Sequence, residues 1–178
     1  TYNALQGTST GQAVDFVDSN NFWNNVNPTI DEVATDAHWG AEVTYDYFLQ
    51  EHKRNSYDNQ GSKIVSYVHW NQNWFNASWN GIAMRYGDGN GNPLISIDVV
   101  GHELAHGVTG NSAGLIYSYE SGALNESFSD IFGNAIEYNV LGSNFSWDIG
   151  ILDFRLRNMG NPKAFGDPNT YLGVNWHT

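Results

Sequence analysis

The spacing of apolar and polar side chains predicts both helix and strand in one chain. Apolar residues recur at helical intervals over residues 30–52, and Asp31 and Glu32 lie in the first turn, where the helix dipole favours negative charge. Residues 63–69 alternate and are rich in β-branched and aromatic side chains, and residues 82–86 show a similar pattern. The pattern therefore predicts one long helix followed by two strands.

The remaining segments add turns and two further helices. The first thirty residues are polar and rich in asparagine, which predicts loop or edge structure, and the Gly, Asn and Pro residues of 87–93 predict a turn. Residues 97–110 and 121–138 both have a helical apolar period. In the second of these helices, the stripe expected to be buried consists of Leu124, Phe128, Ile131, Phe132, Ala135 and Ile136.

Composition and charge exclude several classes of protein. The chain has 178 residues, no cysteine, 7 basic and 19 acidic side chains, and a net charge of −12. It can form neither disulfides nor thiolate sites, and an acidic chain offers no basic surface for nucleic acid or anionic membranes. No apolar run approaches the roughly 20 residues of a membrane helix. The acidity and the abundance of Asn, Gly and Ser favour a secreted, extracellular protein.

A metal-binding motif lies within the helix predicted over residues 97–110. His102, Glu103 and His106 form the pattern His-Glu-x-x-His. Residues four apart share one helix face, so the two imidazoles can bind one ion while Glu103 lies beside it. A carboxylate next to a metal-bound water can take its proton, which is the chemistry of zinc hydrolases.

Two carboxylates on the next predicted helix complete the pattern. Glu126 and Asp130 are four residues apart and share a face. One of them can meet the ion while the other accepts the free N–H of a ligand histidine. A hydrolytic zinc site takes three protein ligands and keeps one position open, so the sequence predicts such a site.

With these motifs in place, the chain resembles the thermolysin-like zinc metalloendopeptidases. The spacing of His106 and Glu126 is the interval at which that family places its third zinc ligand. The resemblance implies that His102, His106 and Glu126 bind Zn²⁺, and that Asn125 and Asp130 hold the two ligand histidines. The match covers nearly all of residues 36–168 and is carried by residues 36–39, 43–48, 76–81, 86–89, 98–103, 112–117 and 122–133.

The resemblance also implies catalytic and substrate-binding roles. Glu103 would be the general base that activates water and then protonates the leaving amine, and Tyr117 would donate a hydrogen bond to the oxyanion. Arg157 would bind a substrate carbonyl next to the cleaved bond.

Four further positions match the parts of the family that contact the peptide. Asn76 and the backbone of Ala77 match an edge strand that pairs with an extended substrate. Val99 and Leu156 match residues lining a pocket for a large apolar side chain just after the cleaved bond. A peptide or protein is thus the implied substrate.

Calcium is the second ion that the resemblance implies. Asp98 and Glu137 match acidic ligands of the family's calcium site near the zinc helices, and hard oxygen ligands suit Ca²⁺. Ser146 and Ile151 stand where the two-ion version of that site has an aspartate and a glutamate. We therefore expect one calcium ion rather than two.

The implied fold is α+β: the β-rich N-terminal lobe of a thermolysin-like (zincin) protease with a long metal-binding helix, truncated at both ends and without the C-terminal helical lobe. We expect one lobe over residues 1–178, divided into helix and sheet (29–95), zinc-binding helices (96–142) and a calcium and substrate loop region (143–178). His177 precedes a threonine, as the family's transition-state histidine does, but lacks its upstream context, so that histidine is expected beyond Thr178.

Two other functions are consistent with parts of the sequence. The chain could be a zinc- and calcium-binding fragment without turnover, unless its own C-terminal lobe, as a separate chain, completes the cleft. Seven tryptophans and many Asn and Gly residues also suit a carbohydrate-binding module. That alternative leaves the His-Glu-x-x-His motif and Glu126 unexplained.

Overall fold

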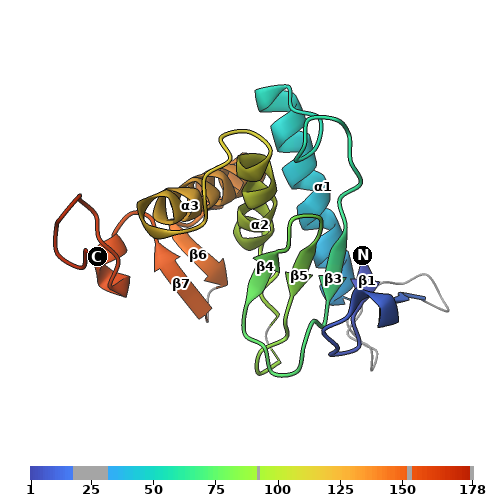
Figure 1. The fold of residues 1–178 in the computed structure, drawn as a ribbon. Helices are drawn as coiled ribbons and strands as arrows, with labels where there is room; N and C mark the ends of the chain where they lie inside the picture. Colours follow the sequence, from blue (N-terminus) through green and yellow to red (C-terminus); the bar gives the residue numbers. More distant parts are fainter. Residues whose placement is uncertain (18–31, 92, 152–153, 177–178) are drawn as a thin grey trace.

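The computed structural model describes residues 1–17, 32–91, 93–151 and 154–176. A small sheet and a hairpin lie at opposite sides of a central helix, α2, and two longer helices flank it (Figure 1). This is the mixed α+β architecture that the sequence predicts. The helices are α1 (Glu32–His52), α2 (Ile97–Gly110) and α3 (Tyr119–Leu141), with short 3₁₀ turns at Thr10–Gln12, Gly142–Asn144 and Pro162–Phe165.

Five short strands form the sheet in the order β2-β1-β3-β5-β4. β3 runs parallel to β1 and β5, whereas β4 is antiparallel to β5 and β2 is antiparallel to β1. β4 therefore occupies one edge of the sheet. The strands are β1 (Tyr2–Asn3), β2 (Val14–Asp15), β3 (Ser66–Val68), β4 (Ala77–Trp79) and β5 (Met84–Tyr86).

The main core lies between the sheet and the helices α1 and α2. Val68, Met84 and Tyr86 point inward from the strands and are fully buried, as are Val100 and Leu104 of α2, at 1% exposure or less. Because successive strand residues face opposite sides, the residues between them form an outer face. The helix over 30–52 and both strands are confirmed within the described residues; residues 30 and 31 lie outside them.

The helix α3 is confirmed, but its buried face is not the predicted apolar stripe. Leu124, Phe128 and Ile131 are 39–47% exposed, and only Ile136 of that stripe is fully buried. α3 instead packs on α2 through small and polar residues. A Cβ added at Gly133 would lie 2.4 Å from the backbone oxygen of Asp98, so the helices approach too closely for large side chains.

After α3 the chain forms a hairpin that the sequence pattern did not predict. β6 (Asp148–Ile151) pairs antiparallel with β7 (Phe154–Asn158) and has an irregularity in register near Gly150. The hairpin packs against α2 and α3 and places Arg157 beside them (Figure 1). Among the described helices, none is long and apolar enough to span a membrane.

Candidate metal centre

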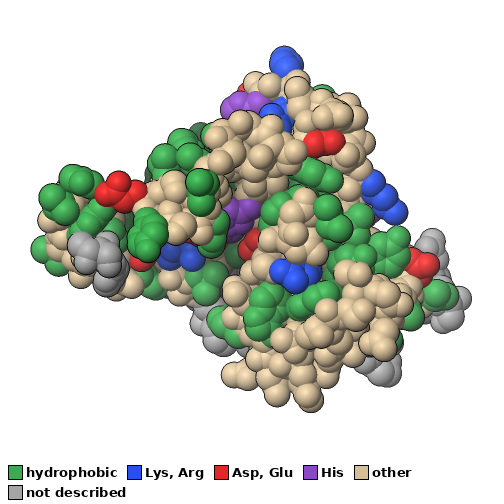
Figure 2. All heavy atoms as spheres, in the orientation of Figure 1, with side chains coloured by type: hydrophobic (Ala, Val, Ile, Leu, Met, Phe, Trp, Pro, Cys, Tyr) green, Lys and Arg blue, Asp and Glu red, His purple; other side chains and the backbone are tan. Residues whose placement is uncertain are grey.

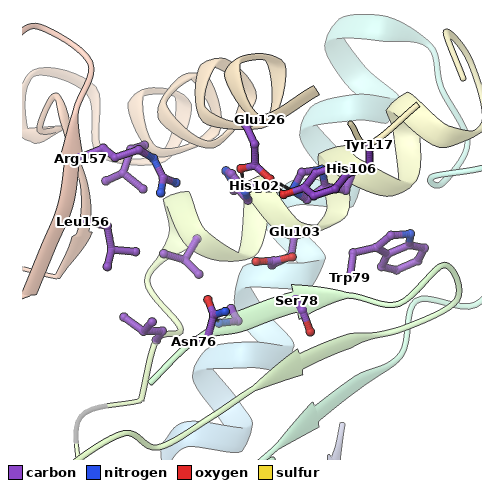
Figure 3. A pocket seen from close by; sticks show the side chains of 14 residues that line it. Asn76, Ser78, Trp79, His102, Glu103, His106, Tyr117, Glu126, Leu156 and Arg157 are labelled. Atoms are coloured by element: carbon purple, nitrogen blue, oxygen red, sulfur yellow. Dashed lines mark hydrogen bonds and ion pairs between the residues drawn. The ribbon is translucent and has the colours of Figure 1, made fainter. Parts of the chain in front are cut away.

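The two histidines of α2 point into a hollow between the sheet and α3, where histidine and acidic side chains are visible at the surface (Figure 2). Their Nε2 atoms are 3.0 Å apart. Glu126, from α3, places its carboxylate oxygens 3.2 Å from Nε2 of His102 and 3.5 Å from Nε2 of His106 (Figure 3). Two consecutive helices, α2 and α3, thus bring three side chains together.

Hydrogen bonds at the other ring nitrogens orient both imidazoles. The Nδ1 atom of His102 lies 2.7 Å from Oδ1 of Asp130, and that of His106 lies 2.7 Å from Oδ1 of Asn125. Both partner atoms are oxygens that accept hydrogen bonds, so a neutral imidazole at either position donates from Nδ1 and keeps its lone pair on Nε2. In that neutral form two lone pairs and a carboxylate face the same point, and a cation between them would neutralise the arrangement.

The donor set fits a zinc ion. In the described part of the chain, His102, His106 and Glu126 form the group of potential ligands whose donor atoms all lie within 4.8 Å of one another. Two nitrogens bound tetrahedrally at zinc distances are about 3.3 Å apart, close to the separation here. Imidazole and carboxylate ligands with an open fourth position are typical of hydrolytic zinc.

Glu103 lies next to this triad but does not belong to it. Its side chain is buried, and the loss of solvation raises its pKa to about 7, against the opposing effect of nearby His102. The negative charge of Glu126 contributes to this rise. A carboxyl group with a pKa near neutrality can both accept and return a proton.

The charges around the ligands are strongly coupled. Burial alone would lower the pKa of His102, but its bonds to Asp130 and Glu126 raise it to about 9. Burial likewise opposes ionisation of Glu126, whereas bonds from His102 and Tyr117 bring its pKa to about 2. Without a metal ion, the site therefore favours a protonated, positively charged His102 beside the carboxylates. That positive charge takes the place that a bound cation would have.

Tyr117 and Arg157 lie on either side of the triad. The Tyr117 hydroxyl donates to Glu126, and the residue is 67% exposed. Burial and the bond to Glu126 raise its pKa to about 12, so it stays a donor at neutral pH. Arg157 donates from Nε and Nη2 to Asp130 at 2.7 and 2.8 Å. Asp130 thus connects Arg157 to His102, a link that sequence reasoning missed.

A cleft of about 580 Å³ surrounds these groups. Asn76 and Ala77, on edge strand β4, form one wall, and Val99 and Leu156 belong to the apolar part of the lining. Sequence reasoning missed two buried residues of the same lining, Leu94 and Ile149, because neither lies in a local motif, and Ile149 reaches the cleft from the hairpin. The structure therefore collects every predicted zinc, catalytic and substrate residue at one cleft: Asn76, Ala77, Val99, His102, Glu103, His106, Tyr117, Glu126, Leu156 and Arg157.

A second acidic cluster consists of Asp98 of α2, Glu137 of α3 and Asp148 of β6, whose charges interact. Asp98 is fully buried, its Oδ2 accepts from the backbone N–H of Gly150 at 2.5 Å, and its Oδ1 has no hydrogen-bond partner among the described residues. Burial, together with the charges of Asp98 and Asp148, raises the pKa of Glu137 to about 7. Asp148, which sequence reasoning missed, joins the two predicted calcium ligands. His177 lies outside the described residues.

An α+β fold whose cleft holds two imidazoles, a carboxylate and a buried glutamate is typical of zinc-dependent hydrolases. Comparison with known families is specific: residues 1–110 match the thermolysin metallopeptidase catalytic domain, and residues 113–177 match the thermolysin metallopeptidase alpha-helical domain. The chain belongs to the thermolysin family of metallopeptidases. α3 and the hairpin fall within the second of these matches.

Individual relatives support the same family. The chain is 44% identical to a bacillolysin of Brevibacillus brevis over 96% of its own length and 32% of the relative. It is 46% identical to a thermolysin of Alicyclobacillus acidocaldarius over 79% of its length and 28% of the relative. The precursor of protealysin from Serratia proteamaculans superposes with a TM-score of 0.74 at 38% identity, over 89% of this chain and 52% of that one. The chain thus spans about a third of the curated relatives it matches.

Proposed function

We propose that this chain carries the zinc site and substrate wall of an endopeptidase that hydrolyses peptide bonds. The observation that carries the proposal is the pair of Nε2 atoms 3.0 Å apart, on imidazoles that hydrogen bonds at Nδ1 orient toward the same point. His102, His106 and Glu126 would hold the ion. Bound zinc would supply a Lewis acid that polarises the peptide carbonyl and acidifies a water molecule.

Proton transfer falls to Glu103 in this proposal. Its carboxylate takes a proton from the attacking water and returns it to the leaving amine, and a pKa of about 7 suits both directions. Tyr117, which keeps its proton at neutral pH, would donate to the developing oxyanion. Arg157, oriented by Asp130, would bind a substrate carbonyl with its remaining donors.

The substrate would bind as an extended strand. β4 is the edge of the sheet beside the cleft, so a peptide can pair with its backbone next to Asn76 and Ala77. Val99 and Leu156, together with buried Leu94 and Ile149, form an apolar surface suited to a large apolar side chain just after the cleaved bond.

We also propose one calcium ion at the acidic cluster. Asp98 has a buried oxygen without a described partner, and Glu137 is close enough to the Asp98 and Asp148 charges for them to raise its pKa. A cation would relieve both effects. The site would tie α2, α3 and the hairpin together.

The location and completeness of the enzyme are further parts of the proposal. The acidic, cysteine-free composition suits a secreted protein stabilised by ions rather than disulfides. Residues 1–178 would act as one catalytic lobe, with a peptide or protein as substrate. The exposed apolar face of α3, formed by Leu124, Phe128 and Ile131, would be covered by the C-terminal lobe of the same enzyme, present as a separate chain. The alternative, an ion-binding fragment without turnover, applies where that face stays uncovered.

Metal content and cleavage test the proposal together. We expect about one zinc per chain and cleavage of a peptide with a central Leu that a chelator abolishes and added zinc restores. Glu103→Ala should keep the zinc and lose cleavage, whereas Glu42→Ala, an exposed glutamate on α1, should keep both. Proteolysis retained by zinc-loaded Glu103→Ala would contradict the assigned base. Zinc binding without cleavage by the unaltered chain favours the fragment alternative.

A further inference from the structure

An arginine lies on the outer face of the sheet, one strand in from the cleft. Arg85 of β5 is opposite Ser78 of β4, and its Nε donates to the Ser78 hydroxyl at 3.0 Å. The guanidinium carbon is 5.1 Å from the ring centroid of Trp70, which is buried. Stacking on the ring and the bond to Ser78 fix the orientation of the guanidinium plane, so little side-chain entropy is lost when it binds a ligand.

The charge of Arg85 is not compensated by a neighbouring acid. Among the described residues, Arg85 forms no ion pair, whereas Arg157 and Arg155 pair with Asp130 and Asp148. Its terminal nitrogens also have no hydrogen-bond partner in that part of the chain. In a chain with a net charge of −12, a fixed arginine beside a cleft without an acidic partner offers a specific place for an anion.

The position of Ser78 connects Arg85 to the substrate. Ser78 lines the cleft between Ala77 and Trp79, at the edge strand where the peptide would pair (Figure 3). A peptide residue opposite Ser78 shares the face of Ser78 and Arg85, because side chains in register point to the same side of a sheet. The Arg85 side chain already reaches across from β5 to Ser78 of β4. A glutamate side chain of a peptide paired with β4 therefore needs to reach across only the spacing between the peptide and β4.

The cleft also indicates which part of the peptide this is. Leu156 lies on one side of Glu103, and Ser78 and Trp79 lie on the other (Figure 3). If the Leu156 side takes the residue after the cleaved bond, the Ser78 side takes residues before it. We propose that Arg85 selects substrates with an acidic side chain on the N-terminal side of the cleaved bond. This inference rests on the proposed endopeptidase function.

Matched peptides test the preference without altering the protein. Three pairs carry Glu or Gln at the first, second or third position before a bond that is followed by Leu. We expect kcat/KM to be about three- to tenfold higher for the Glu peptide in one pair, as for a partly exposed charged hydrogen bond. The ratio should fall toward one in high salt, because the pair is screened. Equal rates in all three pairs at low salt would overturn the proposal.

Variants assign the effect to Arg85. Arg85→Gln should bring the Glu to Gln ratio to about one, and Arg85→Lys should restore part of it. Lys63→Gln removes the same charge from an exposed lysine that contacts Tyr2, three strands from the cleft edge, and should leave the ratio at its original value. A ratio that falls equally in Lys63→Gln would show that net charge alone is responsible, which overturns the proposal.

A binding measurement separates this inference from the proposed function. Fluorescence anisotropy of the same labelled peptides on zinc-loaded Glu103→Gln needs no cleavage. Tighter binding of the Glu peptide that Arg85→Gln removes supports the subsite even where the unaltered chain shows no turnover. Cleavage without any preference for Glu, in rate or binding, leaves the endopeptidase function intact and refutes the role of Arg85.

Discussion

Asp130 connects the metal ligands to the arginine of the cleft, and its charge can be removed with little change of shape by Asp130→Asn. The carboxylate is buried and accepts three hydrogen bonds, from Nδ1 of His102 and from Nε and Nη2 of Arg157, all at 2.7–2.8 Å. An amide offers one oxygen and one NH₂ group. The NH₂ group must therefore face a donor of either histidine or arginine.

The structure sets the size of the two expected losses. Breaking a fully buried ion pair costs about 3–5 kcal/mol, but the Arg157 side chain is 33% exposed, so we expect about 2 kcal/mol of lost stability in the metal-free protein. Removing the negative charge of Asp130, which accepts a hydrogen bond from Nδ1 of His102, should weaken zinc binding about 10- to 100-fold. The pKa of Asp130 is lowered from its ordinary 3.8, since the bonds from His102 and Arg157 outweigh its burial. The difference in the free energy of unfolding between the original protein and Asp130→Asn is therefore present above about pH 3.8 and becomes smaller as the pH falls below that value.

Two measurements check this prediction. Zinc affinity is obtained by competition with a chromophoric chelator at pH 7, and stability by urea unfolding of the metal-free protein at pH 7 and pH 3. Asp46→Asn, which removes an exposed charge from α1, serves as the control and should change neither quantity appreciably. Zinc affinity of Asp130→Asn within twofold of the original protein would refute the reasoning.

Three further predictions concern the calcium cluster, the helix contact and the oxyanion donor. In the folded protein the pKa of Glu137 is raised to about 7, so without calcium its contribution to the free energy of unfolding is present below pH 4.5 and is lost as the pH rises through 7. Calcium should therefore raise the Tm more at pH 8 than at pH 5. Glu137→Gln should remove this difference between the two pH values. Gly133→Ala should cost about 1–3 kcal/mol in urea unfolding because its Cβ meets the backbone of Asp98, whereas Gly110→Ala, which meets nothing within 4 Å, should be neutral or stabilising. Tyr117→Phe should lower kcat about 100-fold with little change in KM or zinc content, and a change confined to KM would contradict its role at the oxyanion.

The metal helix shows why part of the site was predictable from sequence. His102, Glu103 and His106 are adjacent on one helix, and the helical period places them on one face wherever the helix is located. Glu126 and Asp130 share a face of the next long helix for the same reason. The identity and spacing of the ligands are local properties, so the sequence alone predicts them.

The exposed stripe of α3 shows where local reasoning failed. Leu124, Phe128 and Ile131 have the spacing of a buried face, yet α3 packs on α2 through positions such as Gly133 and Ser129. Apolar periodicity shows that a helix has an apolar side but does not identify its partner. The close approach of α2, and the ligands that α3 must bring to it, determine which side is turned inward.

The sequence by itself determined the three long helices and the strands β3 and β5, the acidic and cysteine-free character, and the side chains able to bind zinc. Only the tertiary structure decided that Asp130 joins His102 to Arg157, that Leu94 and Ile149 complete the apolar lining, and that Arg85 reaches Ser78 at the cleft edge. Each of these contacts joins different elements or distant segments of the chain. The physical reason is that periodicity and propensity act over one or two turns, whereas such contacts depend on how whole elements pack.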